Sequence, residues 1–263
     1  MLTSSEKDEL RRIISASLDS AEKRWKEGGH LLKANRQAGL EAMHESAMDS
    51  AEPSKIPGHA IVRDDETVID EFIAFVADMR DSSTHLMCAI SPKNADVSGL
   101  QRVYYETSAL LPALAYSVSK EEGSVTEYLG DGILALFRID SDAREQAIYA
   151  SHRAAKNAIG DVREIVNEAL FERYRLPPVD IGVGLAVSKT LITLVGLAPE
   201  KQPKAFGECV FRATKLSDGR NEVICDENLK AIWPSAKGGT LRFVRKKRKN
   251  EGKVDGYIIG TAA

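Results

Sequence analysis

The chain has 263 residues, of which 43% are hydrophobic and 29% are charged, and its formal net charge is −3. This composition excludes collagen-like, low-complexity and disulfide-scaffold proteins, and the charge points to no nucleic-acid or anionic-membrane partner. No apolar run approaches the length of a membrane-spanning helix, and the N-terminus lacks the apolar core of a signal peptide. The three cysteines are far apart, with no CxxC pair, so we expect buried thiols in a cytoplasmic protein that does not associate with a membrane.

The first part of the chain predicts a helical extension. Apolar residues recur at helical spacing from Leu10 to Leu18, and Ser4 or Ser5 is in position to cap the start of a helix. Gly28-Gly29 interrupts this segment, and a second amphipathic stretch follows at 40–47. We therefore expect a helical N-terminal extension over 1–51, packed on the main domain or on a second copy of the chain. The segment 52–65, rich in proline, glycine and charge, is expected to be a linker.

The main domain, 66–263, alternates predicted strands and helices. The continuous apolar run at 72–77 is typical of a central strand buried on both faces. Gly130-Asp131-Gly132 separates two strands at 124–129 and 133–137 and predicts a tight hairpin. Further helices are expected at 97–120, 142–174 with a break at Gly160, 209–216 and 227–232, and further strands at 179–187, 190–195, 205–206, 223–225, 241–244 and 257–259. The pattern predicts an α+β fold, a mixed sheet covered by helices.

Two carboxylates stand at the ends of predicted strands. Asp78 follows the apolar strand directly, and Asp131 occupies the tip of the hairpin. Carboxylate oxygens suit Mg²⁺ or Mn²⁺, and two ions about 3.5–4 Å apart stabilise the attacking and leaving oxygens of an in-line displacement. The alternative is ordinary turn chemistry, because aspartate is common in loops and in Asp-Gly hairpins. The spacing of the residues alone leaves both interpretations open.

Four segments resemble motifs of the class III nucleotidyl cyclases. Residues 75–83 (FVADMRDSS) resemble the first metal motif of that family, and residues 127–137 (EYLGDGILALF) closely resemble the second. Residues 180–186 (DIGVGLA) look like the next family strand, and residues 206–216 (FGECVFRATKL) look like the segment that carries transition-state residues. The resemblance implies the ferredoxin-like mixed sheet of the cyclase catalytic domain over 66–263.

The resemblance also implies roles for individual residues. Asp78 and Asp131 match the two metal-binding aspartates, and Met79 matches the residue whose backbone carbonyl is a further ligand for two Mn²⁺ or Mg²⁺ ions. Glu127 and Lys204 fall at the two base-selecting positions. The expected phosphate-seating residues are Arg80, Ser82 and Ser83.

Two positions depart from the family pattern. Phe211 stands where the family has a ribose-positioning asparagine, and Lys215 replaces the transition-state arginine. Lysine keeps the charge of arginine but loses its bidentate fork. Arg212 or Arg220 is a nearby candidate to fill that role. Because family sites form between two catalytic domains, the resemblance implies a homodimer with two shared sites, with the metals held by one subunit and Lys215 supplied by the other.

These departures allow two interpretations. In one, the chain is an inactive cyclase-like module for nucleotide binding or dimerisation. In the other, which we favour, the site accepts a different nucleotide, because two facing carboxylates with no metal between them would repel each other. The divergent base pocket and the helical extension resemble the pyrimidine cyclases of bacterial anti-phage defence, the Pycsar systems. This predicts conversion of UTP or CTP to cyclic UMP or cyclic CMP as a second messenger. Glu127 suits guanine equally, so a GTP or ATP cyclase remains an alternative.

Other polar features have simpler expected roles. His85, near the first metal motif, is expected to be a satisfied loop histidine, and Tyr104-Tyr105 is expected to pack in the core or at the dimer contact. The basic run 246–249 is typical of a solvated hairpin tip.

Overall fold

The protein is described by a computed structural model, which covers residues 1–29, 51–64, 66–87, 97–235, 239–247 and 254–261. The helices are α1 (Ser4–Gly28), α2 (Ser82–Met87), α3 (Gly99–Ser119), α4 (Arg144–Asn157), α5 (Arg163–Tyr174), α6 (Glu208–Leu216) and α7 (Glu227–Ala231). The strands are β1 (Ala51–Ile56), β2 (His59–Arg63), β3 (Val68–Met79), β4 (Ser124–Leu129), β5 (Gly132–Arg138), β6 (Ile181–Val195), β7 (Gln202–Gly207), β8 (Glu222–Cys225), β9 (Leu241–Lys246) and β10 (Gly256–Thr261).

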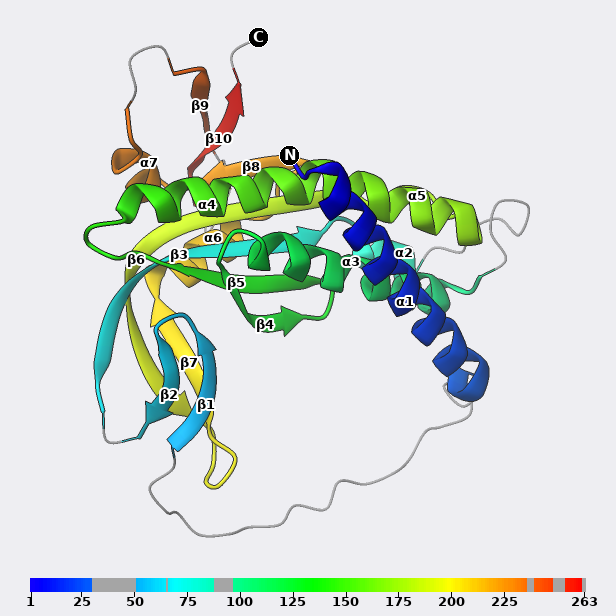
Figure 1. The fold of residues 1–263 in the computed structure, drawn as a ribbon, viewed down its shortest axis with the longest axis horizontal. Coiled ribbons are helices and arrows are strands. Elements are labelled where there is room, and N and C mark those ends of the chain that lie inside the picture. Colours follow the sequence, from blue (N-terminus) through cyan, green and yellow to red (C-terminus); the bar gives the residue numbers. More distant parts are fainter. Residues whose placement is uncertain (30–50, 65, 88–96, 236–238, 248–253, 262–263) are drawn as a thin grey trace.

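Within these described residues, the main sheet has eight strands in the order β4-β5-β3-β6-β8-β10-β9, with β7 paired to the far half of β6. The β6–β8 pair is parallel, and the other pairs in this sheet are antiparallel. Figure 1 shows the long helices α1, α3, α4 and α5 lying over one side of this sheet. The predicted α+β class, a mixed sheet covered by helices, is therefore confirmed.

Strand β3 is buried on both faces, which explains its continuous apolar sequence. Ile73 and Phe75 belong to the core beneath the long helices, on what we call the α3 face. Phe72, Ala74 and Val76 point the other way, into a second core covered by α6, on what we call the α6 face. Alternate side chains of a strand lie on opposite faces, so both faces of this central strand require apolar residues.

The segment 52–65, expected to be a linker, instead contains the β1–β2 hairpin. Ile56 and Val62 are each only 4% exposed and belong to the core of the α6 face. Gly58 makes the turn between the strands with a φ of +81°, a conformation that glycine adopts without strain. The proline, glycine and charged residues of this stretch form its turn and its exposed side. Its two buried apolar residues, Ile56 and Val62, are too few to predict strands from the sequence.

Helix α1 packs on the main domain. Leu10, Ile14 and Leu18 are fully buried in the core of the α3 face, and α1 contacts α3 and α5. The N-cap is Thr3 rather than Ser4 or Ser5, because Thr3 and Glu6 form a capping box. The helix ends at Gly28, and the stretch at 40–47 lies outside the described residues.

Most other predicted elements lie where expected, with two differences. The helical region after residue 142 breaks at Gly160 as predicted, through a π-helical turn at Ala158–Val162. The two strands expected at 179–187 and 190–195 form the single long strand β6, and Pro112 is accommodated inside an uninterrupted α3. Part of the basic run at 246–249 lies outside the described residues. Across the part of the chain that is described, no helix has the length and apolarity needed to cross a membrane.

Candidate active site

Asp78 and Asp131 lie side by side at one end of the sheet. Asp78 is directly opposite Gly132 in the β3–β5 ladder, and the backbone N–H of Met79 donates to the carbonyl of Asp131 at 3.1 Å. Gly132 has no room for a side chain, since a Cβ there would lie 2.3 Å from the carbonyl oxygen of Ala77. The close approach of the hairpin turn to β3 therefore requires glycine after Asp131. The two predicted metal-binding aspartates are thus neighbours in space.

The α6 face of the sheet carries the polar residues of this site. Asp78 lies two residues after Val76, so it projects from the same face as that residue. Glu127 projects from this face as well, because it is opposite Leu134, a residue of the core on the α6 face. The candidate metal residue and the first candidate base-selecting residue therefore share one side of the sheet.

Each aspartate has a partner from the segment that follows β3. The Arg80 guanidinium donates to Asp78, and the Ser82 hydroxyl donates to Asp131. Burial lowers the pKa of Arg80, while Asp218, Asp131 and Asp81 act to raise it. Arg80 thus offsets the repulsion between the carboxylates. The argument that such a pair requires a metal for stability therefore does not hold for this chain.

The oxygen donors suit a divalent ion that also binds substrate. No group of three or more histidine, cysteine or acidic side chains converges anywhere in the described residues, so the site offers two carboxylates. Mg²⁺ in phosphate-transferring sites is typically bound by one or two carboxylates together with substrate phosphates and water. Asp78, Asp131 and the Met79 carbonyl fit that pattern, and Ser83, at the exposed start of α2, adds no contact to it.

Glu127 and Lys204 form an ion pair. The Lys204 ammonium lies 3.0 Å from the Glu127 carboxylate, and each side chain is about one third exposed, at 30% and 33%. The contact joins β4 to β7, and β1 contacts both of these strands. The structure therefore brings together the two residues at the predicted base-selecting positions and gives them one hydrogen-bond acceptor and one donor.

The three candidate residues on α6 differ in their exposure and in their ion pairs. Phe211 is 67% exposed, and Lys215 is exposed one turn further along the same face of the helix. Within the described part of the chain, Lys215 makes no hydrogen bond or ion pair. Arg212 is bound by Glu208 at 2.6 Å and Glu227 at 3.3 Å. None of the three contacts the aspartates of its own chain through a described hydrogen bond or ion pair, so they do not complete the site within one copy.

Comparisons with known proteins bear on the fold. No protein-family model matches the chain. A segment of 111 residues is 32% identical to a terminal-differentiation-specific adenylate cyclase of Dictyostelium discoideum, and it covers 42% of this chain and 5% of that protein. The solved guanylyl cyclase Cya2 superposes with a TM-score of 0.52 at 16% identity, over 73% of this chain and 91% of that one. The adenylyl cyclase CyaB from P. aeruginosa gives a TM-score of 0.57 at 12% identity, over 75% of this chain and 97% of that one.

The chain has the fold of a class III nucleotide cyclase catalytic domain. At such low identities the solved structures establish the fold alone. They include both an adenylyl and a guanylyl cyclase, so the fold does not favour one base over another.

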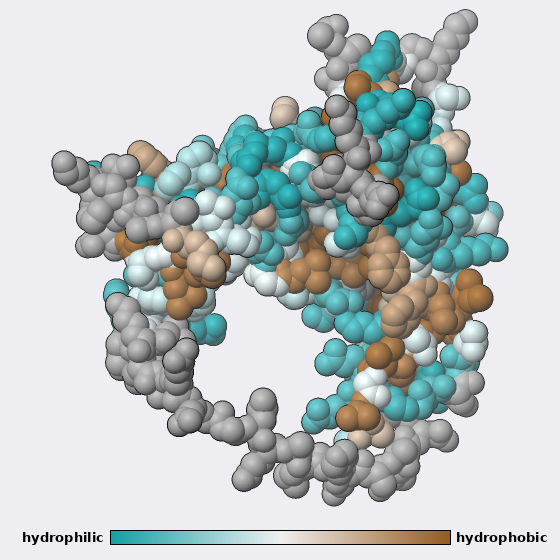
Figure 2. Space-filling model, turned by 180° about the vertical axis from the view of Figure 1, so that it is seen from behind, coloured by the Kyte–Doolittle hydropathy of each residue, from teal (hydrophilic) through white to brown (hydrophobic). Residues whose placement is uncertain are grey.

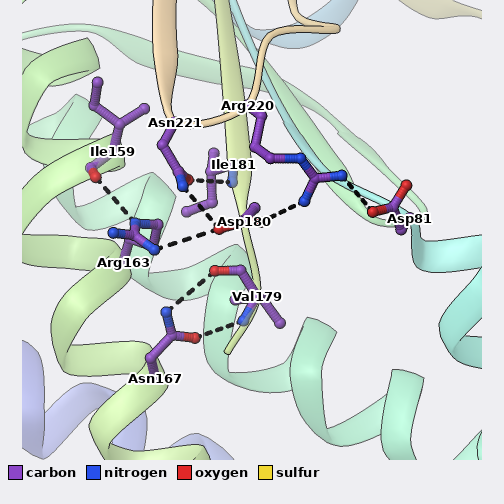
Figure 3. A network of polar contacts seen from close by, with 9 residues as sticks. All are labelled: Asp81, Ile159, Arg163, Asn167, Val179, Asp180, Ile181, Arg220 and Asn221. Carbon is purple, nitrogen blue, oxygen red and sulfur yellow. Dashed lines mark hydrogen bonds and ion pairs between the residues drawn. The ribbon is translucent and has the colours of Figure 1, made fainter. Parts of the chain in front are cut away.

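A charged network beside the two candidate metal-binding aspartates was not predicted from the sequence. Figure 3 shows Asp180 accepting hydrogen bonds from Asn221 at 2.7 Å and Arg163 at 3.4 Å, and from Arg220. Arg220 also donates to Asp81, which stands between Arg80 and Ser82. The residues of this network come from four separate segments of the chain, so their spacing in the sequence does not predict that they meet. The Asp-Gly-Arg-Asn sequence at 218–221 signals a turn and no more.

His85 is a satisfied histidine, as expected. Its Nδ1 lies 2.9 Å from the carboxylate of Glu106, which is fully buried and also accepts from Arg102 at 2.7 Å. These contacts fix α2 against α3.

Proposed function

We propose that this chain is a nucleotide cyclase that converts UTP or CTP to the 3′,5′-cyclic monophosphate and pyrophosphate. The observation that supports it best is the juxtaposition of Asp78 and Asp131 at one end of the sheet of a cyclase fold. The product would serve as a cytoplasmic second messenger in bacterial anti-phage defence, as the resemblance to the pyrimidine cyclases implies. The purine alternative rests on the adenylyl and guanylyl cyclases with the same fold.

Asp78, Asp131 and the Met79 carbonyl would hold two Mg²⁺ or Mn²⁺ ions. When bound, such ions supply Lewis-acid stabilisation of the charge on the attacking and leaving oxygens. A metal bound at the Asp78 oxygen that now accepts from Arg80 would displace the guanidinium from it. The released guanidinium faces the substrate phosphates, which is the role the sequence predicts for it. Ser82 keeps the Asp131 carboxylate oriented.

The reaction is an in-line displacement within one substrate molecule. The ribose 3′ oxygen forms a bond to the α-phosphorus and loses its proton to solvent. The bond from that phosphorus to the bridging oxygen breaks, and pyrophosphate leaves. A cation is needed beside the α-phosphate, where negative charge develops. We assign this role to Lys215 of a second copy, because Lys215 is exposed on α6 and has no ion pair among the described residues.

The base would lie against Glu127 and Lys204. The carboxylate accepts from uracil N3–H or the cytosine amino group, and the ammonium donates to a pyrimidine carbonyl. Phe211 or Tyr128 would narrow the space against a purine. Both side chains are well exposed, at 67% and 55%, so they are accessible to a ligand or to a second copy.

A homodimer with two shared sites would complete the active site. Exposed apolar residues gather on the far half of β6 and on β7, namely Leu191, Val195 and Phe206. Figure 2 shows apolar surface over the lobe formed by these strands and on the adjoining body. An exposed apolar surface of this kind is typical of a protein–protein contact. It lies near Phe211 and Lys215 in the chain, which supports their contribution to the partner's site.

An inactive nucleotide-binding module is the second candidate, and one observation favours it. The Arg80–Asp78 ion pair neutralises a metal-binding carboxylate without any metal. A chain that had lost catalysis would be stabilised by such a pair.

Incubation of the purified chain with each of the four nucleoside triphosphates and Mn²⁺, followed by mass analysis, separates these functions. We expect cyclic UMP or cyclic CMP from the wild type and no product from Asp78→Asn. A cyclic purine nucleotide as the sole product would replace the pyrimidine assignment with the purine one. The absence of every cyclic product would favour the inactive module.

A further inference from the structure

Helix α2, which follows the candidate metal-binding segment 78–81, has no buried apolar side chain to hold it in place. The structure describes all six of its residues, and only Ser82 and His85 among them are not exposed. Leu86 and Met87 are 42% and 82% exposed. A helix this short is not stable in water by itself. The position of α2 must therefore be set by polar and backbone contacts with its neighbours.

The side chain of His85 reaches a fully buried carboxylate on α3. Its Nδ1 lies 2.9 Å from Oε2 of Glu106, and Oε1 of Glu106 accepts from Arg102 at 2.7 Å. A carboxylate oxygen can only accept, so the His85 Nδ1 is the donor. A buried carboxylate is costly unless it is paired and hydrogen-bonded. Because Arg102 supplies the charge and His85 supplies the second hydrogen bond, the buried carboxylate holds α2 against α3.

The backbones of α2 and α3 also meet closely. A Cβ on Gly99, the first residue of α3, would lie only 2.5 Å from the carbonyl oxygen of Leu86. A larger residue at position 99 would therefore push the end of α2 away. This backbone packing is independent of the His85 side chain, and it fixes α2 from a second direction.

The same short helix carries the side chain that contacts Asp131. The Ser82 hydroxyl donates to the Asp131 carboxylate. Ser82 and His85 are three positions apart and so lie on the same side of the helix. The backbone N–H of His85 donates to the carbonyl of Asp81 at 2.9 Å and closes the turn between them. One helical turn thus links the buried Glu106 to Asp131.

We propose that His85 and Glu106 are positioning residues for Asp131. They place Ser82, whose hydroxyl orients the carboxylate for a divalent ion. The partners of a metal-binding carboxylate set its orientation, and their loss weakens metal binding. This inference rests on the metal site of the proposed cyclase, and it assigns the site a support that extends into the core beneath α3.

Titration of the full chain with Mn²⁺, with the free ion measured by electron paramagnetic resonance, tests the assignment without any nucleotide. We expect His85→Ala to weaken Mn²⁺ binding by about threefold to tenfold, which is less than the loss of Asp131 itself. His85→Asn places an amide donor near the position of Nδ1 and should restore most of the affinity. His59→Ala is the matched control, because His59 is similarly buried and lies 3.0 Å from Asp70, at the other end of β3. Its Mn²⁺ affinity should equal that of the wild type.

Two further variants separate positioning from a general loss of stability. In a Ser82→Ala background, His85→Ala should weaken Mn²⁺ binding no further, because its effect passes through the missing hydroxyl. Gly99→Ala displaces α2 without changing His85, and it should weaken Mn²⁺ binding as His85→Ala does.

The outcomes distinguish this inference from the proposed function. Wild-type Mn²⁺ affinity in both His85→Ala and Gly99→Ala would overturn the inference, even if a cyclic product is formed. A loss in His85→Ala that adds in full to the loss in Ser82→Ala would overturn it as well. Mn²⁺ binding that depends on His85 through Ser82, with no cyclic product from any nucleotide, would support the inference and reject the cyclase.

Discussion

Glu127 and Lys204 form an ion pair of 3.0 Å between β4 and β7, two strands that are not neighbours in the sheet. A base bound here would exchange hydrogen bonds with both groups in place of their bond to each other. The pair therefore defines the polarity that a base edge must present, with a donor toward Glu127 and an acceptor toward Lys204. This relationship leads to the first prediction.

Glu127→Gln should alter base preference, because a neutral amide both donates and accepts where the carboxylate only accepts. We expect kcat/KM for the preferred nucleotide to fall by about tenfold or more, mainly through KM, and its ratio to the other three nucleotides to change. Steady-state rates with UTP, CTP, GTP and ATP measure this. Glu122→Gln, in the exposed turn that follows α3, is the control. An unchanged order and ratio of the four nucleotides in Glu127→Gln would exclude this pair from base selection.

The convergence of Asp78 and Asp131 was predictable from the sequence because its determinants are local. An apolar strand that ends in aspartate and a Gly-Asp-Gly hairpin each define a strand end, and the resemblance supplied their order in the sheet. The β1–β2 hairpin was not predictable in this way. Its anchors Ile56 and Val62 are isolated apolar residues among polar ones, and only the tertiary packing shows that they are buried.

Long-range polar contacts were the other feature that the sequence did not reveal. The Arg220–Asp81 bond joins residues 139 positions apart, and neither belongs to a motif that indicates the other. The Arg80–Asp78 pair also changed the interpretation, because it removes the repulsion on which the sequence argument for a bound metal relied. In both cases, the pairing of charged side chains depends on geometry that residue spacing does not encode.

Helix α1 should contribute directly to the stability of the main domain. Ile14 of this helix is fully buried, while the adjacent Ile13 is only partly buried. We expect Ile14→Ala to lower the free energy of unfolding by about 2–4 kcal/mol, since it removes buried methyl groups and leaves a cavity. Ile13→Ala, the same substitution one position earlier, should have a clearly smaller effect. Urea denaturation measures both. Equal effects would show that α1 does not dock as described.

Asp226 should make the domain less stable at pH 8 than at pH 4. Burial raises the pKa of Asp226 to about 6, and its Oδ1 accepts from the Leu229 N–H at 2.8 Å as the cap of α7. A raised folded-state pKa contributes stability that is complete below the unfolded value of 3.8 and is lost as the pH rises through 6. Asp226→Asn keeps the cap without the charge. We expect it to be more stable than wild type by roughly 1–3 kcal/mol at pH 8, with the difference vanishing near pH 4.

Denaturation of both proteins across this pH range checks the prediction for Asp226. A stability difference that is the same at pH 8 and at pH 4 would show that the carboxylate does not titrate as described.

Shared sites predict complementation between two inactive variants. Asp131→Ala removes a metal ligand, and Lys215→Ala removes the charge supplied to the partner. Each alone should lack activity. Random pairing of equal amounts gives one intact site in half of the dimers, so we expect about a quarter of the wild-type rate. A mixture that stays inactive, although mass analysis shows mixed dimers, would place the aspartates and Lys215 in the same subunit's site.

The central claim is that Asp78 and Asp131 bind a divalent ion together. Titration of the full chain with Mn²⁺, followed by electron paramagnetic resonance of the free ion, measures this without reference to any nucleotide. We expect binding by the wild type, weakened about tenfold or more in both Asp78→Asn and Asp131→Asn, and unchanged in Asp140→Asn, an exposed carboxylate away from the site. Identical Mn²⁺ binding by the wild type and the Asp78 and Asp131 variants would contradict the claim.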